Sequence, residues 1–299
     1  MNKVYSRQAK LLLDVLPEVA KEECFAMHGG TAINLFVRDM PRLSVDIDLT
    51  YVEIAERNET LDAINAALAR IKGRIENLRP SMRVHHKEKV CKLQVDEHGV
   101  IIKVEVNMVG RGVLGDITTA QLCDAAQEQF DAFCAIPIVP MAQLYGGKLC
   151  AAMDRQHPRD LFDVKLLLEN EGFNDDIKRG FIFGLVSGSR PTHEMLNPNL
   201  LNQRVALDNQ FEGMSAIAFS YDDYECTRAT LIEIIKTNLN ELDKGFLLCF
   251  NRLEPDWSIY DFQKFPSVKW KLLNLAKFKQ DNPDAYQQQL RKLESILAK

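Results

Sequence analysis

The spacing of apolar residues predicts a series of short elements in the first part of the chain. Residues 1–23 carry leucines and valines on one side, which predicts an amphipathic helix. A short strand is predicted at 24–27, a short helix at 31–38 and a second strand at 44–50. Apolar side chains then recur at helical spacing, which predicts a long helix at 54–77.

The following segment has the two-residue period of β-strands. Residues 90–95 and 100–109 alternate between apolar and polar side chains, and Glu97-His98-Gly99 joins them as a hairpin turn. Four apolar side chains of the second strand are expected mainly on one side: Ile102, Val104, Val106 and Val109. The first 140 residues are therefore expected to form a mixed β-sheet with helices packed on it.

The rest of the chain has a helical pattern. Pro137 and Pro140 interrupt the strand pattern, and helical periodicity recurs in 227–240 and 269–298. We predict an α+β fold with two domains, a sheet-containing core at 1–140 and a mainly helical domain at 141–299.

Composition narrows the class of protein. The chain has 299 residues and 46% hydrophobic residues, which is ordinary for a globular protein. No apolar stretch is long enough to span a bilayer and the N-terminus lacks the pattern of a signal peptide, so we expect a cytoplasmic protein that does not associate with membranes. The seven cysteines are scattered without metal-ligand spacing, as is typical of buried thiols in a reducing compartment.

The first candidate site combines a glycine turn with a pair of aspartates. Gly29 and Gly30 precede the short helix that contains Thr31, so their backbone N–H groups can bind phosphate. Asp46 and Asp48 lie two residues apart on a strand and project from the same face. Such oxygen ligands suit Mg²⁺ that accompanies a nucleoside triphosphate. The alternative is a plain turn followed by the polar side of an edge strand.

A third carboxylate occupies the middle of the second hairpin strand. Glu105 is flanked by valines, and a carboxylate buried there requires a partner. A metal ion shared with Asp46 and Asp48 would supply that partner. A salt bridge to Lys92 or to a nearby arginine is the alternative.

A second cluster of charged residues lies where two predicted helices meet. Lys148 and Arg155 are seven residues apart and share a helix face, Pro158 ends that helix, and Asp160 and Asp163 share one face of the next. The two cations are suited to triphosphate oxygens, and the carboxylates could orient them or accept a proton. The alternative is a salt-bridged corner that braces the two helices.

The segment between residues 70 and 103 is basic although the net charge of the chain is −5. That net charge argues against broad, non-specific nucleic-acid binding. The local run predicts either a solvated surface or a patch that binds a polyanion such as RNA. Its nine cations are Arg70, Lys72, Arg74, Arg79, Arg83, Lys87, Lys89, Lys92 and Lys103.

Three segments together resemble the AbiEii/AbiGii toxin family of the DNA polymerase β-like nucleotidyltransferase superfamily. They are His28-Gly29-Gly30-Thr31-Ala32, Arg42-x-Ser44-x-Asp46-Ile47-Asp48-Leu49 and Lys148-Leu149-x-Ala151-x(3)-Arg155-x(3)-Arg159-Asp160-x-x-Asp163. Residues 266–274 also resemble the C-terminal pattern of the family. The superfamily usually has Gly-Ser before its Asp-x-Asp, whereas this chain has Gly29-Gly30-Thr31 and a longer stretch before Asp46.

The resemblance implies a nucleotidyltransferase-like core whose nucleotide site is completed by the helical domain. It implies a toxin of an abortive-infection or type IV toxin–antitoxin system that acts in phage defence. The toxin would transfer a nucleotide from an NTP to an acceptor such as tRNA, using Mg²⁺ or Mn²⁺, and a cognate antitoxin would be its partner. A non-catalytic module that sequesters a nucleotide or a partner is the alternative.

The residue patterns, read together with this resemblance, assign roles to individual residues. The expected catalytic residues are Asp46, Asp48, Glu105, Lys148 and Asp163. The expected metal ligands are Asp46, Asp48 and Glu105. The expected nucleotide-binding residues are Gly29, Gly30, Thr31, Lys148 and Arg155.

Overall fold

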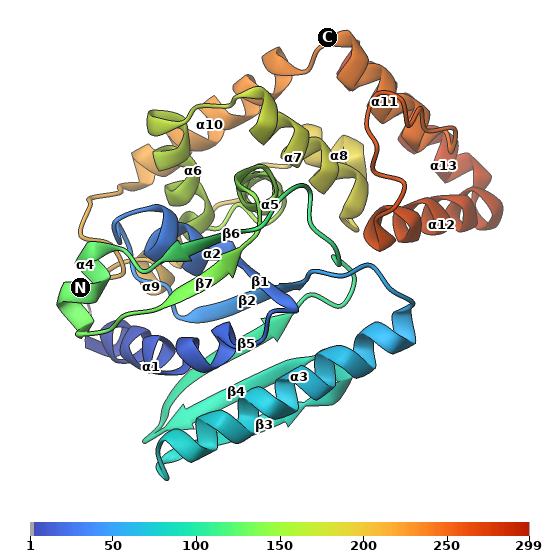
Figure 1. Ribbon diagram of the computed structural model, residues 1–299. Helices are drawn as coiled ribbons and strands as arrows, with labels where there is room; N and C mark the ends of the chain where they lie inside the picture. Colours follow the sequence, from blue (N-terminus) through green and yellow to red (C-terminus); the bar gives the residue numbers. More distant parts are fainter. Residues whose placement is uncertain (1–2, 299) are drawn as a thin grey trace. The chain divides into compact units, whose positions relative to one another are not determined.

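A computed structural model describes residues 3–298, and these divide into two compact units (Figure 1). Within the described residues, the first unit comprises 3–140 and Phe211–Ala218, and the second comprises Met141–Gln210 and 219–298. Among residues 3–298, no helix has the length and apolar character needed to cross a membrane.

The first unit is built on a mixed β-sheet, as the sequence predicted. In the described residues the sheet has seven strands in the order β3-β4-β5-β2-β1-β7-β6. The strands are β1 (Phe25–His28), β2 (Asp46–Tyr51), β3 (Met82–Lys87), β4 (Lys92–Glu97), β5 (Val100–Val106), β6 (Thr118–Gln121) and β7 (Ala135–Ile138). Strand β2 lies antiparallel to β1 and parallel to β5, so it occupies the middle of the sheet.

Helices α1 (Lys3–Ala20) and α3 (Arg57–Leu78) pack on the sheet, and alternation along the strands places the apolar residues against them (Figure 1). Val84, Leu93 and Val104 are buried, whereas Arg83 and Lys103 on the opposite face are exposed. We call that opposite face of β2 to β5 the open face. The unit also contains α2 (Gly29–Ala32), π-helix η1 (Ile33–Val37), 3₁₀-helix η2 (Glu88–Val90) and α4 (Asp124–Phe130).

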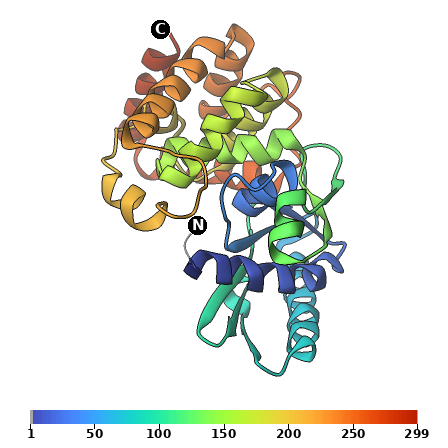
Figure 2. The same ribbon diagram turned by 90° about the vertical axis from the view of Figure 1, so that its left-hand side faces the viewer.

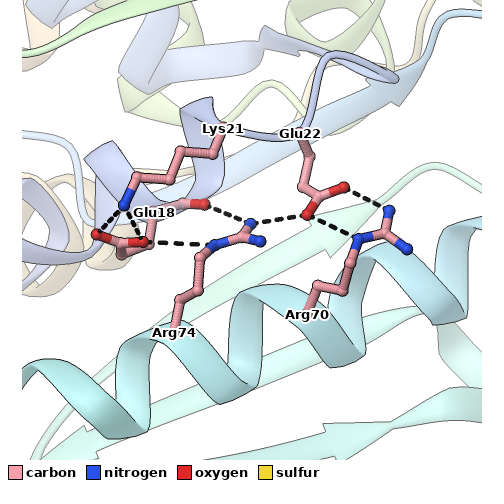
Figure 3. A network of polar contacts seen from close by, with 5 residues as sticks. All are labelled: Glu18, Lys21, Glu22, Arg70 and Arg74. Carbon is pink, nitrogen blue, oxygen red and sulfur yellow. Dashed lines mark hydrogen bonds and ion pairs between the residues drawn. The ribbon is translucent and has the colours of Figure 1, made fainter.

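An ion-pair network joins α1 to α3 (Figure 3). Glu22 accepts hydrogen bonds from Arg70 Nη2 at 2.6 Å and Arg74 Nη2 at 2.7 Å, and Lys21 pairs with Glu18. Burial alone would raise the pKa of Glu22, but the two guanidinium groups outweigh it and lower that pKa. Two arginines of the basic run are therefore engaged with the carboxylates of the neighbouring segment.

The second unit consists of helices in its described part (Figure 2). Gly146 and Gly180 let α5 and α7 pack closely, because a side chain on Gly180 would overlap the carbonyl of Ala142. The helices are α5 (Met141–Asp154), α6 (Pro158–Asn170), α7 (Asp175–Ser187), α8 (Thr192–Leu196), α9 (Arg204–Gln210), α10 (Tyr221–Asn238), α11 (Glu241–Asn251), α12 (Pro266–Asp281) and α13 (Pro283–Leu297).

The structure differs from the predicted organisation in two details. Strand β5 ends at Val106 because the Asn107 side chain accepts hydrogen bonds from the N–H groups of Val109 and Gly110 and forms a turn. Val109 is consequently 44% exposed instead of facing the sheet interior. Phe211–Ala218, which the sequence placed within the helical domain, belongs to the first unit.

Candidate functional site

The glycine turn lies directly after β1 and packs against Asp48. Gly29 has a φ of +77°, which a glycine adopts without steric cost. A β-carbon on Gly29 would also overlap the Asp48 carboxylate, which lies opposite His28 in the β1–β2 register. Both the backbone conformation and the space therefore require glycine at this position.

The second glycine and the residue after it are held by the loop before β2. A β-carbon on Gly30 would lie 2.8 Å from Arg42 Nη2 and 3.2 Å from Ser44 Oγ. Thr31 has no exposed surface, and its hydroxyl donates to the Asp46 carbonyl at 2.5 Å and lies 2.9 Å from Ser44 Oγ. The hydroxyl of Thr31 thus fixes the start of β2, which leaves the backbone N–H as the group with which Thr31 can bind phosphate.

The three predicted metal ligands lie on the same face of adjacent strands. Asp46 and Asp48 are half-buried and share one face of β2. In the parallel β2–β5 register, Asp46 lies opposite Lys103 and Asp48 lies opposite Glu105. Residues opposite each other in adjacent strands project to the same side, so all three carboxylates belong to the open face.

Glu105 makes an ion pair with Lys92 of β4, and the side chain of Glu105 is 42% exposed. Among residues 3–298, no three His, Cys, Asp or Glu side chains come together closely enough to hold a metal ion. Mg²⁺ commonly uses one or two protein carboxylates together with substrate phosphates. The Asp46–Asp48 pair fits that donor set, whereas Glu105 has the ion-pair partner considered as its alternative.

The fold places six of the nine cations of the basic run in two groups. Arg79 pairs with Asp14 and Glu97. Arg70 pairs with Glu22, which follows α1, and Arg74 pairs with both Glu22 and Glu18 of α1 (Figure 3). The second group lies exposed on the open face and comprises Arg83, His85 and Lys87 of β3 and Lys103 of β5. Residues that lie opposite one another in β3, β4, β5 and β2 form two rows across this face. The first row is His85, Gln94, Lys103 and Asp46. The second row is Lys87, Lys92, Glu105 and Asp48.

In the second unit, the predicted charged corner forms a buried cluster. Lys148 Nζ lies 2.8 Å from Asp160 Oδ1 and 2.9 Å from Asp163 Oδ2, and all three side chains are buried. Arg155 Nε lies 2.5 Å from Asp160 Oδ2, while the Arg155 side chain is 62% exposed. These ion pairs join two cations to two carboxylates.

The local sequence explains how this corner forms. His157 caps α6 because its Nδ1 accepts the backbone N–H of Arg159, and Pro158 occupies the first turn. Burial alone would raise the pKa of Asp160, but Lys148 and Arg155 outweigh it, so that pKa lies well below its ordinary value. The ion pairs brace α5 against α6. The contact of Lys148 and Arg155 with a triphosphate stays a prediction.

Three contributors to the first unit's site had no predicted role. Arg42 and Ser44 contact the glycine turn, and Phe211–Ala218 contacts the loop that carries them. The Arg-x-Ser spacing before Asp46 was visible in the sequence as part of the family resemblance. No repeating apolar pattern marks 211–218, so sequence reasoning could not place it beside the turn.

Comparison with known proteins identifies the fold and family to which this arrangement is similar. The sequence model described as the nucleotidyl transferase AbiEii toxin of type IV toxin–antitoxin systems matches residues 10–294. No curated protein matches the chain. Among solved structures, MenT4, a nucleotidyltransferase toxin from Mycobacterium tuberculosis H37Rv, is similar with a TM-score of 0.62 and 13% identity, over 91% of this chain and 93% of that chain. This likeness confirms the predicted nucleotidyltransferase-like α+β fold.

Proposed function

We propose that this chain, which belongs to the AbiEii nucleotidyl transferase toxin family of type IV toxin–antitoxin systems, transfers a nucleotide to an RNA acceptor at the open face of its sheet. Family membership makes it a nucleotidyltransferase toxin and implies an antitoxin partner and a nucleotide substrate. The observation that carries the proposal is the pair of half-buried aspartates, Asp46 and Asp48, on one strand beside the Gly29-Gly30 turn.

Asp46 and Asp48 are the proposed ligands of a divalent cation, Mg²⁺ or Mn²⁺. A bound cation of this kind neutralises triphosphate charge and stabilises the charge that develops during transfer. The chain contributes two carboxylates at fixed positions, because the Thr31 hydroxyl holds the Asp46 carbonyl and Gly29 accommodates the Asp48 carboxylate. Glu105 lies opposite Asp48 and remains the proposed third ligand, which would hold the metal only if its carboxylate were released from the ion pair with Lys92.

The Gly29-Gly30 turn is the proposed cradle for the triphosphate. The first N–H groups of a helix have no carbonyl partner within that helix. Helix α2 begins at Gly29 and continues into η1, so the N–H groups of Gly29, Gly30 and Thr31 lie in its first turn. Backbone donors of this kind bind phosphate oxygens without adding a side chain.

The helical unit carries a separate proposal. Lys148 and Arg155 are proposed to contact triphosphate oxygens, with Asp163 orienting Lys148 through their ion pair. Arg155 offers the cleaner test because its side chain is largely exposed and Asp160 keeps Lys148 when Arg155 is replaced. We expect Arg155→Ala to weaken NTP affinity several-fold, as measured by titration, with little change in thermal stability.

The exposed cations of the open face support an RNA acceptor. Lys103 occupies the row that contains Asp46, and Lys87 the row that contains Asp48. Adjacent strands lie about 4.8 Å apart, so a row from β2 to β3 spans roughly 15 Å. A nucleic-acid backbone bound along the cations would therefore bring one of its ends close to the aspartates, and tRNA is the acceptor we propose.

Transfer of labelled nucleotide tests the proposal. Purified protein is incubated with each labelled NTP, Mg²⁺ and total tRNA, and Asp46→Asn is compared with wild type. We expect Asp46→Asn to reduce labelling by roughly 10³-fold, because the metal site supplies several kcal/mol of charge stabilisation. Asp62→Asn, an exposed carboxamide substitution on α3, is the matched control and should label like wild type.

Two results would contradict the proposal. Equal labelling by wild type and Asp46→Asn would remove the aspartates from the metal site. Growth arrest on expression of both the wild type and the Asp46→Asn, Asp48→Asn double variant would favour sequestration of a nucleotide or partner over catalysis.

A further inference from the structure

The loop that supports the glycine turn is buried but irregular. Residues 38–45 form neither helix nor strand, yet Leu43 has no exposed surface and Arg42 is only 2% exposed. Buried backbone groups are almost always hydrogen-bonded. An irregular buried loop must therefore take its backbone partners from another segment.

Those partners come from Phe211–Ala218, which we call the return segment because the chain re-enters the first unit there. Leu43 donates its N–H to the Met214 carbonyl at 2.8 Å. The Ser215 hydroxyl lies 3.0 Å from the Pro41 carbonyl and 2.9 Å from the Ile217 carbonyl, so its one proton is shared between these two acceptors. Arg42 and Ser215 also form an isolated antiparallel bridge.

The side chain of Met214 anchors the return segment from within. Met214 is buried in the first unit, and its N–H donates to the Phe211 carbonyl at 2.9 Å. The residues on either side, in α9 and α10, belong to the second unit. Residues about 170 positions away along the chain are thus brought to the 41–43 backbone.

A continuous set of contacts leads from this segment to the proposed site. Arg42 donates from Nη1 to the Leu43 carbonyl, which holds its guanidinium in place, and Nη2 lies over Gly30. Ser44 Oγ lies 2.9 Å from the Thr31 hydroxyl, and that hydroxyl donates to the Asp46 carbonyl. A shift of this loop would therefore displace both the glycine turn and the start of the aspartate strand.

We propose that the return segment is a positioning element for nucleotide binding. Through Met214 and Ser215 it holds the 41–44 loop against Gly30, and Arg42 is a positioning residue that acts through the turn. This inference rests on the proposed function, since it requires the Gly29-Gly30 turn to bind the triphosphate. A purely structural role of the segment would change stability without changing nucleotide binding.

Replacement of Ser215 tests the positioning role in the full-length protein. Ser215→Ala removes the hydroxyl that reaches the Pro41 carbonyl and that also contacts the Ile217 backbone. We expect the KM for NTP to rise about fivefold with kcat within twofold, because the net worth of the contact with the 41–43 backbone is that of one hydrogen bond. Ser215→Thr keeps a hydroxyl and should restore most of the wild-type KM. Ser81→Ala removes a hydroxyl that donates to Glu97 at 2.8 Å in the same unit and should leave KM unchanged.

Hydrogen–deuterium exchange gives a second readout that does not depend on catalysis. In Ser215→Ala we expect faster exchange in peptides that cover residues 29–44, whereas Ser81→Ala should exchange like wild type. A lowered melting temperature with an unchanged KM would overturn the inference, as would unchanged KM and unchanged exchange. Those results are distinct from failure of the proposed function, in which Asp46→Asn transfers nucleotide as well as wild type does.

Discussion

The two charged clusters of this chain hold their carboxylates in different environments. On the open face, Asp46 and Asp48 are half-buried neighbours on one strand. In the helical unit, Asp160 and Asp163 are fully buried and both contact Lys148. A buried carboxylate is stable only with a partner already in place, so the second cluster is complete without a ligand.

This difference separates two uses of the same residue types. The buried cluster joins two carboxylates to two cations, and replacing Lys148 takes one cation away from two buried carboxylates. On the open face, the carboxylates of Asp46 and Asp48 lie two residues apart and are only half-buried, so that a cation from solvent can reach them. We therefore expect substitutions on the open face to affect activity, and substitutions of the three buried members of the cluster, Lys148, Asp160 and Asp163, to affect stability. Arg155 is the exposed member and is the exception, since its replacement is expected to weaken NTP affinity instead.

The largest effect is expected for the second aspartate of the open face. Asp48→Asn should lower the transfer rate roughly 10³-fold, because metal binding contributes several kcal/mol to the transition state. The free energy of unfolding should change by less than about 1 kcal/mol, since the site is half-exposed. Transfer assays and urea unfolding of the same preparation measure both quantities. If Asp48→Asn were unfolded enough to explain its lower transfer rate, the open face would not differ from the buried cluster in this respect.

The buried cluster should show the opposite behaviour. Lys148→Met leaves Asp160 with Arg155 and deprives the buried Asp163 of its lysine, so the free energy of unfolding should fall by about 3–5 kcal/mol in urea. Lys244→Met, which removes a 3.2 Å pair with the exposed Glu241, is the control and should cost less than about 1 kcal/mol. An unchanged free energy of unfolding in Lys148→Met would show that the cluster does not brace α5 against α6.

A smaller effect should appear in RNA binding by the open face. Reversal of Arg83, Lys87 and Lys103 to glutamate should lower RNA affinity more than tenfold. The slope of log affinity against log salt concentration should become shallower by about two to three, because each phosphate contact contributes about 0.7–0.9 to that slope. NTP affinity should be unchanged. Filter binding at several salt concentrations measures both effects.

The matched control for this surface reverses the same number of exposed cations in the other unit. Lys236, Arg291 and Lys292 are exposed on α10 and α13, and their reversal changes the net charge equally. RNA binding that falls equally in both triple variants would reflect net charge alone and would remove the acceptor from the open face.

The smallest effect concerns acid stability. The pKa of Asp160 in the folded protein lies below its ordinary value of 3.8, so the unfolded chain takes up this proton first as the pH falls. The stabilisation is present above about pH 4 and is lost below it, with a slope of at most about 1.4 kcal/mol per pH unit for one proton. Asp160→Asn should show a shallower slope in urea unfolding between pH 4 and 2. An unchanged slope would mean that other carboxylates carry the acid sensitivity.

Local patterns predicted those parts of the fold whose cause is local. The amphipathic pattern of 1–23 became α1 at Lys3–Ala20, and the 54–77 pattern became α3 at Arg57–Leu78. The predicted hairpin turn is present, with His98 and Gly99 both at positive φ between antiparallel strands. Strands β3, β6 and β7 were not predicted. Short strands of this kind depend on their neighbours in the sheet more than on their own sequence.

For the candidate site, the sequence alone determined which residue types stand where: two aspartates on one strand face, a glycine turn before them, and cations spaced to meet carboxylates across a helix corner. Only the tertiary structure decided the partners, because an ion pair depends on distances between segments far apart in the chain. It paired Glu105 with Lys92, buried Lys148 between two aspartates and brought Met214 to Leu43. Periodicity records which face a residue occupies, whereas the free energy of a charge depends on what packs against that face.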